Sequence, residues 1–167
     1  MQRTAALLLG ALALAVGLAG LPASAQQWIG TYNDWNVFQR NEGARVCYMS
    51  STPIDMEPKS VRRSDVYVRV THGAQGRDTV EIIPGYGLDA QGTAVVTVDA
   101  TEFRLRSIGT GAVPTDAAQD AALVKAMMVG SRMAVRVNSG RGSATVDTYS
   151  LTGFTAAHGS MSASCRA

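Results

Sequence analysis

Few residues in this sequence have side chains suited to catalysis or metal binding. The 167-residue chain contains two cysteines and two histidines, Cys47, Cys165, His72 and His158. Their spacing is unlike that of a zinc finger, and neither histidine belongs to a pattern of metal ligands. Gly-x-Ser-x-Gly, Ser-x-x-Lys and His-Glu-x-x-His motifs are absent, as is a phosphate-binding loop. We therefore predict that the protein is not an enzyme and has neither a catalytic residue, a metal nor a cofactor.

The acidic residues leave one enzymatic alternative open. A glycosidase needs two carboxylates that face one cleft, and scattered side chains can meet in a folded chain. A pair of carboxylates, or a contact between a histidine and a carboxylate, in a cleft would favour an enzyme. The candidates are Asp34, Glu81, Asp89, Asp99, Glu102 and Asp147.

The first 25 residues have the pattern of a secretory signal peptide. Arg3 supplies the positive charge, the uncharged run 5–21 is rich in Ala and Leu, and Ala23-Ser24-Ala25 suits signal peptidase. The apolar run is shorter than the roughly 20 residues of a membrane-spanning helix. We predict cleavage after Ala25, a single mature domain over residues 26–167, and a location in the periplasm, outside the cell or at the outer membrane.

The two cysteines are predicted to form a disulfide. Export exposes the chain to oxidising conditions, under which two lone thiols most simply pair with each other. A bridge between Cys47 and Cys165 would tie the C-terminus to an early strand. The alternatives are a redox role, which lacks a Cys-x-x-Cys motif, and a nucleophilic Cys165 beside His158.

The charges suggest a surface that contacts anions. With 15 basic and 13 acidic residues, the chain is too close to neutral for a dedicated nucleic-acid binder. A short basic loop follows the segment 53–58, and further arginines occupy the polar phase of predicted strands. The predicted contacts are anionic lipid, a glycan, or an envelope or host-surface protein; the alternative is ordinary solvated or cross-strand-paired charge. The predicted anion-contact residues are Lys59, Arg62, Arg63, Arg69, Arg104 and Arg106, with Arg132 and Arg136 in the same phase.

Alternating apolar and polar residues predict a chain made mainly of strands. In the final strand, Val146 and Leu151 have opposite phases, which predicts a bulge or an end near Thr148. Glycine-rich turns between the strands suit antiparallel hairpins. The predicted strands are 35–40, 46–50, 66–70, 79–83, 94–98, 102–106, 132–137 and 143–150.

Two segments are predicted to be helical. Thr115 or Asp116 can cap the first helix, which ends at Gly130. The second lies at the C-terminus, where apolar residues recur every three or four positions from 151 to 165. The expected fold is a mainly β, antiparallel β-sandwich with one or two peripheral helices.

Several of these segments together resemble the invasion-associated locus B family. The similarity lies in Asp34-Trp35, Val46-Cys47-Tyr48, Gly85-Tyr86-Gly87, the run 147–157 and the closing Cys165. The resemblance implies an exported bacterial envelope protein, linked in some pathogens to entry into host cells, and it implies no catalytic or cofactor residue. Many members have further cysteines, which this chain lacks at 38–39 and within 109–128.

The sequence favours a non-enzymatic interaction module that acts through its surface. The alternative is a periplasmic carrier that holds a small apolar or anionic ligand between sheet and helix. A cavity lined by Phe103, Met127, Met128 and Phe154 would favour the carrier, whereas a filled core with a basic exterior would favour the interaction module.

Overall fold

The computed structural model describes residues 26–42, 44–73 and 76–166, which form eleven strands and two helices. The predicted signal peptide lies outside the described residues. The strands are β1 (Gln26–Tyr32), β2 (Trp35–Glu42), β3 (Ala44–Ser51), β4 (Asp55–Glu57), β5 (Tyr67–His72), β6 (Asp78–Ile83), β7 (Thr93–Val98), β8 (Thr101–Ile108), β9 (Gly111–Val113), β10 (Arg132–Asn138) and β11 (Ala144–Ser150). The helices are α1 (Ala117–Val129) and α2 (Phe154–Arg166).

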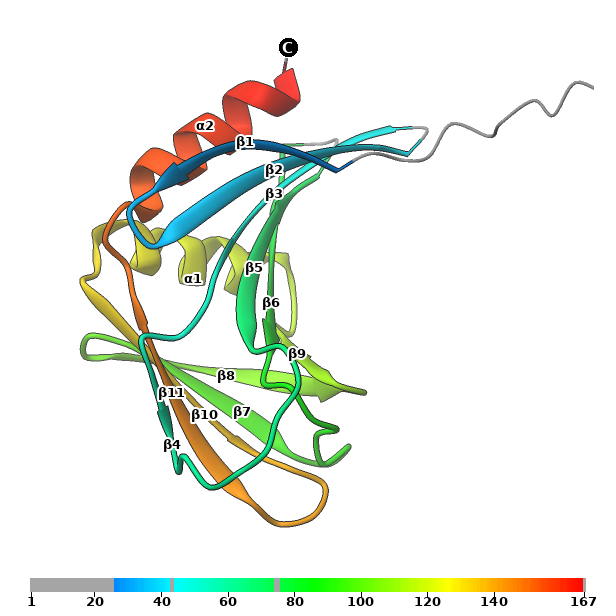
Figure 1. Ribbon diagram of the computed structural model, residues 1–167, viewed down its shortest axis with the longest axis vertical. Coiled ribbons are helices and arrows are strands. Elements are labelled where there is room, and N and C mark those ends of the chain that lie inside the picture. Colours follow the sequence, from blue (N-terminus) through cyan, green and yellow to red (C-terminus); the bar gives the residue numbers. More distant parts are fainter. Residues whose placement is uncertain (1–25, 43, 74–75, 167) are drawn as a thin grey trace, which may run out of the picture.

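All strands belong to one antiparallel sheet, in the order β1-β2-β3-β5-β6-β9-β8-β7-β10-β11-β4. The sheet bends so strongly that its two halves face each other across the core (Figure 1). The halves are also joined across the core, because the indole of Trp35 on β2 donates to the carbonyl of Ser150 on β11 at 3.1 Å. The predicted mainly β, antiparallel fold with two helices is therefore confirmed, and its two layers are parts of a single bent sheet.

The strands alternate between a buried inner face and an accessible outer face. On β5, Val68 and Val70 are fully buried while Arg69 points to the other side. On β10, Met133 and Val135 are fully buried and Arg136 is exposed. This alternation follows directly from the two-residue period of a strand. The inner face of the sheet is the one that lines the core, and the outer face is the opposite one.

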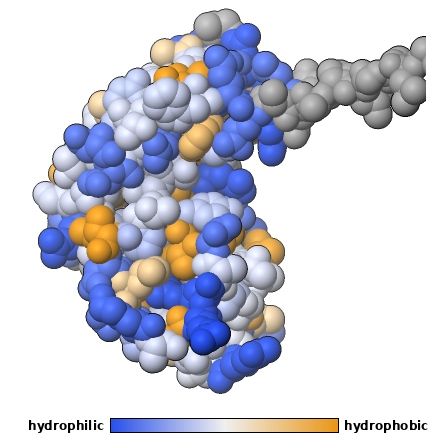
Figure 2. Space-filling model, viewed as in Figure 1, coloured by the Kyte–Doolittle hydropathy of each residue, from blue (hydrophilic) through white to orange (hydrophobic). Residues whose placement is uncertain are grey.

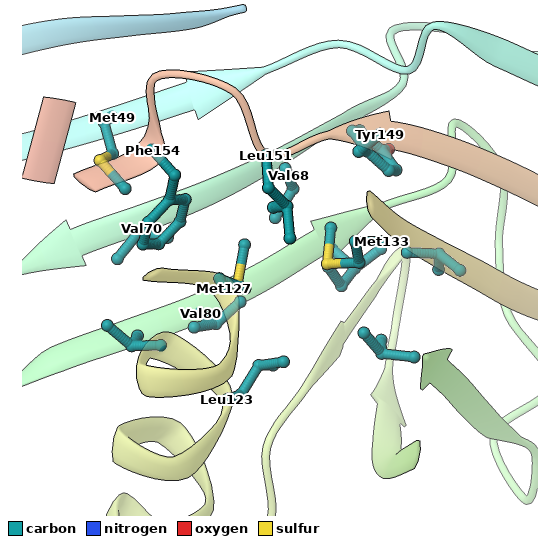
Figure 3. Close-up of a cluster of buried hydrophobic side chains, with 14 of the residues drawn as sticks. Met49, Val68, Val70, Val80, Leu123, Met127, Met133, Tyr149, Leu151 and Phe154 are labelled. Atoms are coloured by element: carbon teal, nitrogen blue, oxygen red, sulfur yellow. The ribbon is translucent and has the colours of Figure 1, made fainter. Parts of the chain in front are cut away.

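Apolar side chains from both halves of the sheet and from both helices fill the core (Figure 3). Phe154, the first residue of α2, meets Trp35 edge to face, with ring centroids 4.8 Å apart. Met127 of α1 and Phe154 are both fully buried. The interface between sheet and helices is therefore packed with side chains.

Helix α1 begins with the cap that the sequence predicts. The Asp116 carboxylate accepts a hydrogen bond from the Gln119 amide, and the Gln119 side chain accepts one from the Thr115 amide. The helix sits where β6 separates from β9, and Asp120 accepts the Val80 amide hydrogen bond there at 2.7 Å. The helix thus satisfies a backbone group that the sheet leaves unpaired at its bend.

The predicted disulfide fixes α2 to the sheet. Cys47 of β3 and Cys165 of α2 are bonded, with their Cα atoms 5.7 Å apart. The helix also buries Ala157 and Met161 against the inner face. Because the thiols are consumed in the bridge, Cys165 is not a free nucleophile, and the alternative of a reactive cysteine is wrong.

The structure differs from the predictions at the end of β11 and in three strands that were not predicted. β11 continues in regular register to Ser150 without a bulge, so the predicted bulge or early end near Thr148 is wrong. Leu151 has the opposite phase because it lies beyond the strand. The sequence patterns also do not predict the strands β1, β4 and β9; β1 contains a register shift between Trp28 and Gly30, and β4 and β9 have three residues each.

Candidate functional site

A buried ion pair holds the segment between β4 and β5 against the inner face of β11. The Arg63 Nη1 atom lies 2.7 Å from both oxygens of Asp147, with hydrogen-bond geometry to Oδ2. The two side chains are 4% and 0% exposed. Asp147 opens the run 147–157 that carries the family resemblance, and its charge here serves to anchor Arg63.

Burial dominates the electrostatics around this pair. It raises the pKa of Asp147 above its ordinary value, although the Arg63 guanidinium acts in the opposite direction. Burial, and next the negative charge of Asp147, also raise the pKa of Tyr149. The buried Tyr149 hydroxyl has no hydrogen-bond partner among the described residues. The neutral phenol therefore persists throughout the physiological range.

The predicted basic loop does not act as one cationic patch. Arg63 is a correction to the predicted anion-contact surface, because it is buried and already paired with Asp147. Lys59 is exposed, and its ammonium group lies 2.9 Å from Asp55 and 3.7 Å from Glu57. Arg62 is exposed and has no ion pair or side-chain hydrogen bond within the described chain. Of the three residues, Arg62 alone retains an accessible, uncompensated charge.

The remaining predicted arginines share the outer face of the bent sheet. Arg104 and Arg136 lie in one row, because each is the register partner of Val95 on β7. Arg106 follows on β8, and Arg69 lies on β5 in the other half of the sheet. The apolar side chains of α1 and α2 are buried in the core on the opposite side. These arginines therefore share the outer face of the sheet, with Arg69 in one half and the other three in the opposite half.

Two of the outer-face arginines have acidic partners. Arg69 pairs across strands with Glu81 and lies over the Tyr48 ring, 5.9 Å from its centroid. Arg104 pairs with Glu102 at 2.7 Å, although it remains 69% exposed. Ordinary cross-strand pairing therefore accounts for part of the pattern.

An aromatic row on the outer face was not predicted. Trp28, Phe38 and Tyr48 are aligned across β1, β2 and β3 by the strand register. The Phe38 and Tyr48 rings stack at 5.2 Å, and Trp28 is 60% exposed. Sequence reasoning missed the row because it did not recognise β1 as a strand. Of the other large exposed apolar residues, Ile54 and Met56 line one hollow at β4, whereas Ile108 and Val129 lie on β8 and α1; Figure 2 shows scattered apolar spots on the face in view.

The two histidines meet at one carboxylate. Asp78 on β6 contacts His72 Nδ1 of β5 and His158 Nε2 of α2, each at 2.6 Å. Burial acts to raise the pKa of Asp78, but the hydrogen bonds from His158 and then His72 outweigh it, so the pKa lies below its ordinary value. No sequence motif indicates this contact, because His158 and Asp78 are 80 residues apart.

The contact between histidines and a carboxylate satisfies one condition that would favour an enzyme. Asp78 lines a cavity of about 270 Å³ beside α1. However, each imidazole contacts the same carboxylate through one of its nitrogens, and neither contacts a hydroxyl group among the described residues. The described residues also contain no group of three side chains that could hold a metal ion. The arrangement serves best as a tie between α2 and the β5–β6 hairpin.

Gly153 explains part of the specific C-terminal run. It adopts φ of +90°, and a Cβ atom there would lie 2.0 Å from the Tyr32 carbonyl oxygen. Only glycine accommodates both the left-handed backbone and this close approach. The turn that starts α2 is thereby packed directly against the end of β1.

The residues proposed for a carrier cavity do not form one. Met127 and Phe154 are fully buried in the core, and Phe103 and Met128 pack partly buried against it. The interface between sheet and helices is therefore filled at these four residues. Within the described residues, no helix has the length and apolar character needed to cross a membrane.

Comparisons with known proteins agree with the fold. A search of curated proteins found no match. The crystal structure of invasion associated protein B from Bartonella henselae is similar, with a TM-score of 0.62 and 17% identity over 83% of this chain and 98% of that chain. The family model for invasion associated locus B (IalB) protein matches residues 35–162. The chain described here belongs to the invasion associated locus B family.

Proposed function

We propose that this chain is exported after cleavage near Ala25 and acts as a non-enzymatic interaction module of the bacterial envelope. In this proposal, the outer face of the sheet binds an anionic partner. The observation that carries it is the alignment of exposed Arg104 and Arg136 on one face of a continuous sheet, with Arg106 beside them. The invasion association in the family's description supports a setting at the cell surface.

Arginine suits this role for physical reasons. Its guanidinium stays charged at every physiological pH and matches the geometry of phosphate and carboxylate groups. Arg104 and Arg136 are separated by a single strand, so the two charges can contact one extended anionic surface together. Individual contacts of this kind are weak, but several in parallel produce useful affinity.

Processing has a direct test. The mature protein is expected to begin at Gln26 and to be found outside the cytoplasm. N-terminal sequencing of native protein from fractionated cells measures both properties. An intact Met1 on the exported material would contradict the proposal.

Binding is tested with vesicles of phosphatidylcholine containing phosphatidylglycerol, and separately with a soluble polyuronate glycan. The variant Arg104→Ser/Arg136→Ser should bind anionic vesicles or the glycan more weakly than the wild type, with an unchanged melting temperature. The matched control, Lys125→Ser/Arg166→Ser, also removes two exposed positive charges, but from the helices. Equal loss in both variants would indicate a response to net charge alone and would contradict a specific face.

A further inference from the structure

A hollow lies beside the segment that Arg63 anchors. It has a volume of about 590 Å³, larger than the hollows of about 350, 330 and 270 Å³ elsewhere in the described chain. Sites for small ligands have volumes in this range. Its walls come from the segment between β4 and β5, the chain after β6 and the turn between β10 and β11. The lining residues are Val61, Arg62, Tyr86, Gly87, Leu88, Ser139, Gly140, Arg141 and Ser143.

The charged side chains that line this hollow are all positive. Arg62 and Arg141 are the only charged residues among those that line it. Both are exposed, and the described residues offer neither guanidinium an ion pair or hydrogen bond. By contrast, each of the other three hollows contains at least one carboxylate. Guanidinium groups recognise oxyanions through charge-assisted, often bidentate hydrogen bonds, so two of them at one concave site suit an oxyanion ligand.

The walls of the hollow are held in place by hydrogen bonds. The Gly140 amide donates to the Gly87 carbonyl at 3.0 Å. The Ser139 hydroxyl accepts from the amides of Arg141 and Ser143, at 3.3 and 2.9 Å. These bonds fix the turn that carries Arg141 to the opposite wall. A site held in place before binding loses less entropy when a ligand arrives.

The wall that carries Arg62 is fixed independently. Its neighbour Arg63 is bound to Asp147, and the Ser64 amide donates to the Gly85 carbonyl at 3.0 Å. Gly85 has φ of +81°, and a Cβ atom there would lie 2.8 Å from the Ser64 carbonyl oxygen. The Gly85-Tyr86-Gly87 segment therefore allows the two walls to approach closely.

The remaining lining of the hollow is partly apolar and suits a compact organic ligand. Val61, Leu88 and the Tyr86 ring provide an apolar wall, and the Tyr86 hydroxyl is already bonded to Thr145 Oγ1 at 2.5 Å. An aromatic or aliphatic wall next to polar groups is suited to the C–H face of a sugar ring. We propose that this hollow binds a small sugar that carries an oxyanion, with Arg62 and Arg141 holding its phosphate or carboxylate group.

The site is tested by titrating the disulfide-bonded protein with glucose 6-phosphate, glucuronate and neutral glucose, using isothermal calorimetry. At least one charged sugar should bind, and glucose should bind at least about tenfold more weakly, since hydrogen bonds to charged groups contribute about 1.5–3 kcal/mol. Binding of glucose 6-phosphate alone would identify a phosphate site, and binding of both charged sugars a general oxyanion site. Failure of both to bind, or equal binding of glucose, would overturn the proposal.

Variants separate this hollow from the outer face of the sheet. Arg62→Ser/Arg141→Ser should weaken binding of the charged sugar at least about tenfold at an unchanged melting temperature. Ser143→Trp, which obstructs the hollow and keeps both arginines, should also weaken it. Arg104→Ser/Arg136→Ser should leave sugar binding unchanged, so failure of the outer-face proposal does not affect this test. Wild-type affinity in Arg62→Ser/Arg141→Ser would refute the assignment.

Discussion

Replacing Arg63 by Met should destabilise the protein strongly, because it leaves the Asp147 carboxylate without its partner. Asp147 is fully buried, and the Arg63 side chain is 4% exposed. Removing one member of a buried pair costs about 3–5 kcal/mol. For a domain of this size, such a loss lowers the melting temperature by roughly 10–20 °C. Urea unfolding at pH 7 measures the free energy.

The effect should depend on pH in a defined direction. Burial already raises the pKa of Asp147, and loss of the guanidinium raises it further. An aspartate in the unfolded chain has a pKa of about 3.9. Between that pH and the raised native pKa, Asp147 is therefore protonated in the folded Arg63→Met protein and ionised in the unfolded chain. The loss of stability relative to the wild type should be largest above the pKa of Asp147 in the folded variant. It should diminish as the pH falls toward about 4.

A double-mutant cycle completes the test. Arg63→Met/Asp147→Leu removes both charges, so it should be more stable than Arg63→Met alone. Lys59→Met, which breaks the exposed pair with Asp55, should leave the melting temperature unchanged. Additive effects of Arg63→Met and Asp147→Leu on the free energy of unfolding would refute the buried-pair reasoning. So would a wild-type free energy of unfolding in Arg63→Met.

Three other structural features have equally direct tests. Cys47→Ser and Cys165→Ser should each lower the free energy of unfolding by about 2–5 kcal/mol, and the double variant should be no less stable than either. Free thiols in the denatured, unreduced wild type would contradict the bridge. Gly153→Ala should cost about 2 kcal/mol or more in urea unfolding, whereas Gly159→Ala, with open space around its Cβ position, should be neutral or stabilising. Asp78→Asn should lower the free energy of unfolding at pH 6. Because the native pKa of Asp78 is lowered, the greater stability of the wild type should disappear as the pH falls below about 4. A stability difference that does not change with pH would contradict a stabilising contact between Asp78 and the two histidines.

The parts of the fold that sequence predicts best are those with a strong local signal. The alternation in Val68, Arg69 and Val70 identifies β5, and the Asp116 cap identifies the start of α1. β4 and β9 have three residues each, too few to establish a period, and the register shift in β1 interrupts its alternation. The bend of the sheet depends on contacts between distant segments, which no local pattern records.

The candidate sites show the same limit. Lys59, Arg62 and Arg63 look alike in sequence, but Asp147, 84 residues from Arg63, neutralises that one residue in the core. Arg141 lies in the hairpin turn between β10 and β11, and its proximity to Arg62 follows only from the packed loops. The outer-face arginines were predictable in phase, since a strand fixes the side on which each residue lies.

The salt dependence of vesicle binding tests the central proposal most directly. Binding to vesicles containing phosphatidylglycerol should weaken steeply as salt rises, because screening shortens electrostatic interactions to roughly 8–10 Å near physiological ionic strength. Arg104→Ser/Arg136→Ser should bind more weakly at low salt and show a shallower dependence, while Lys125→Ser/Arg166→Ser should retain the wild-type slope. Wild-type binding that does not respond to salt, or an unchanged slope in Arg104→Ser/Arg136→Ser, would contradict an anion-binding outer face.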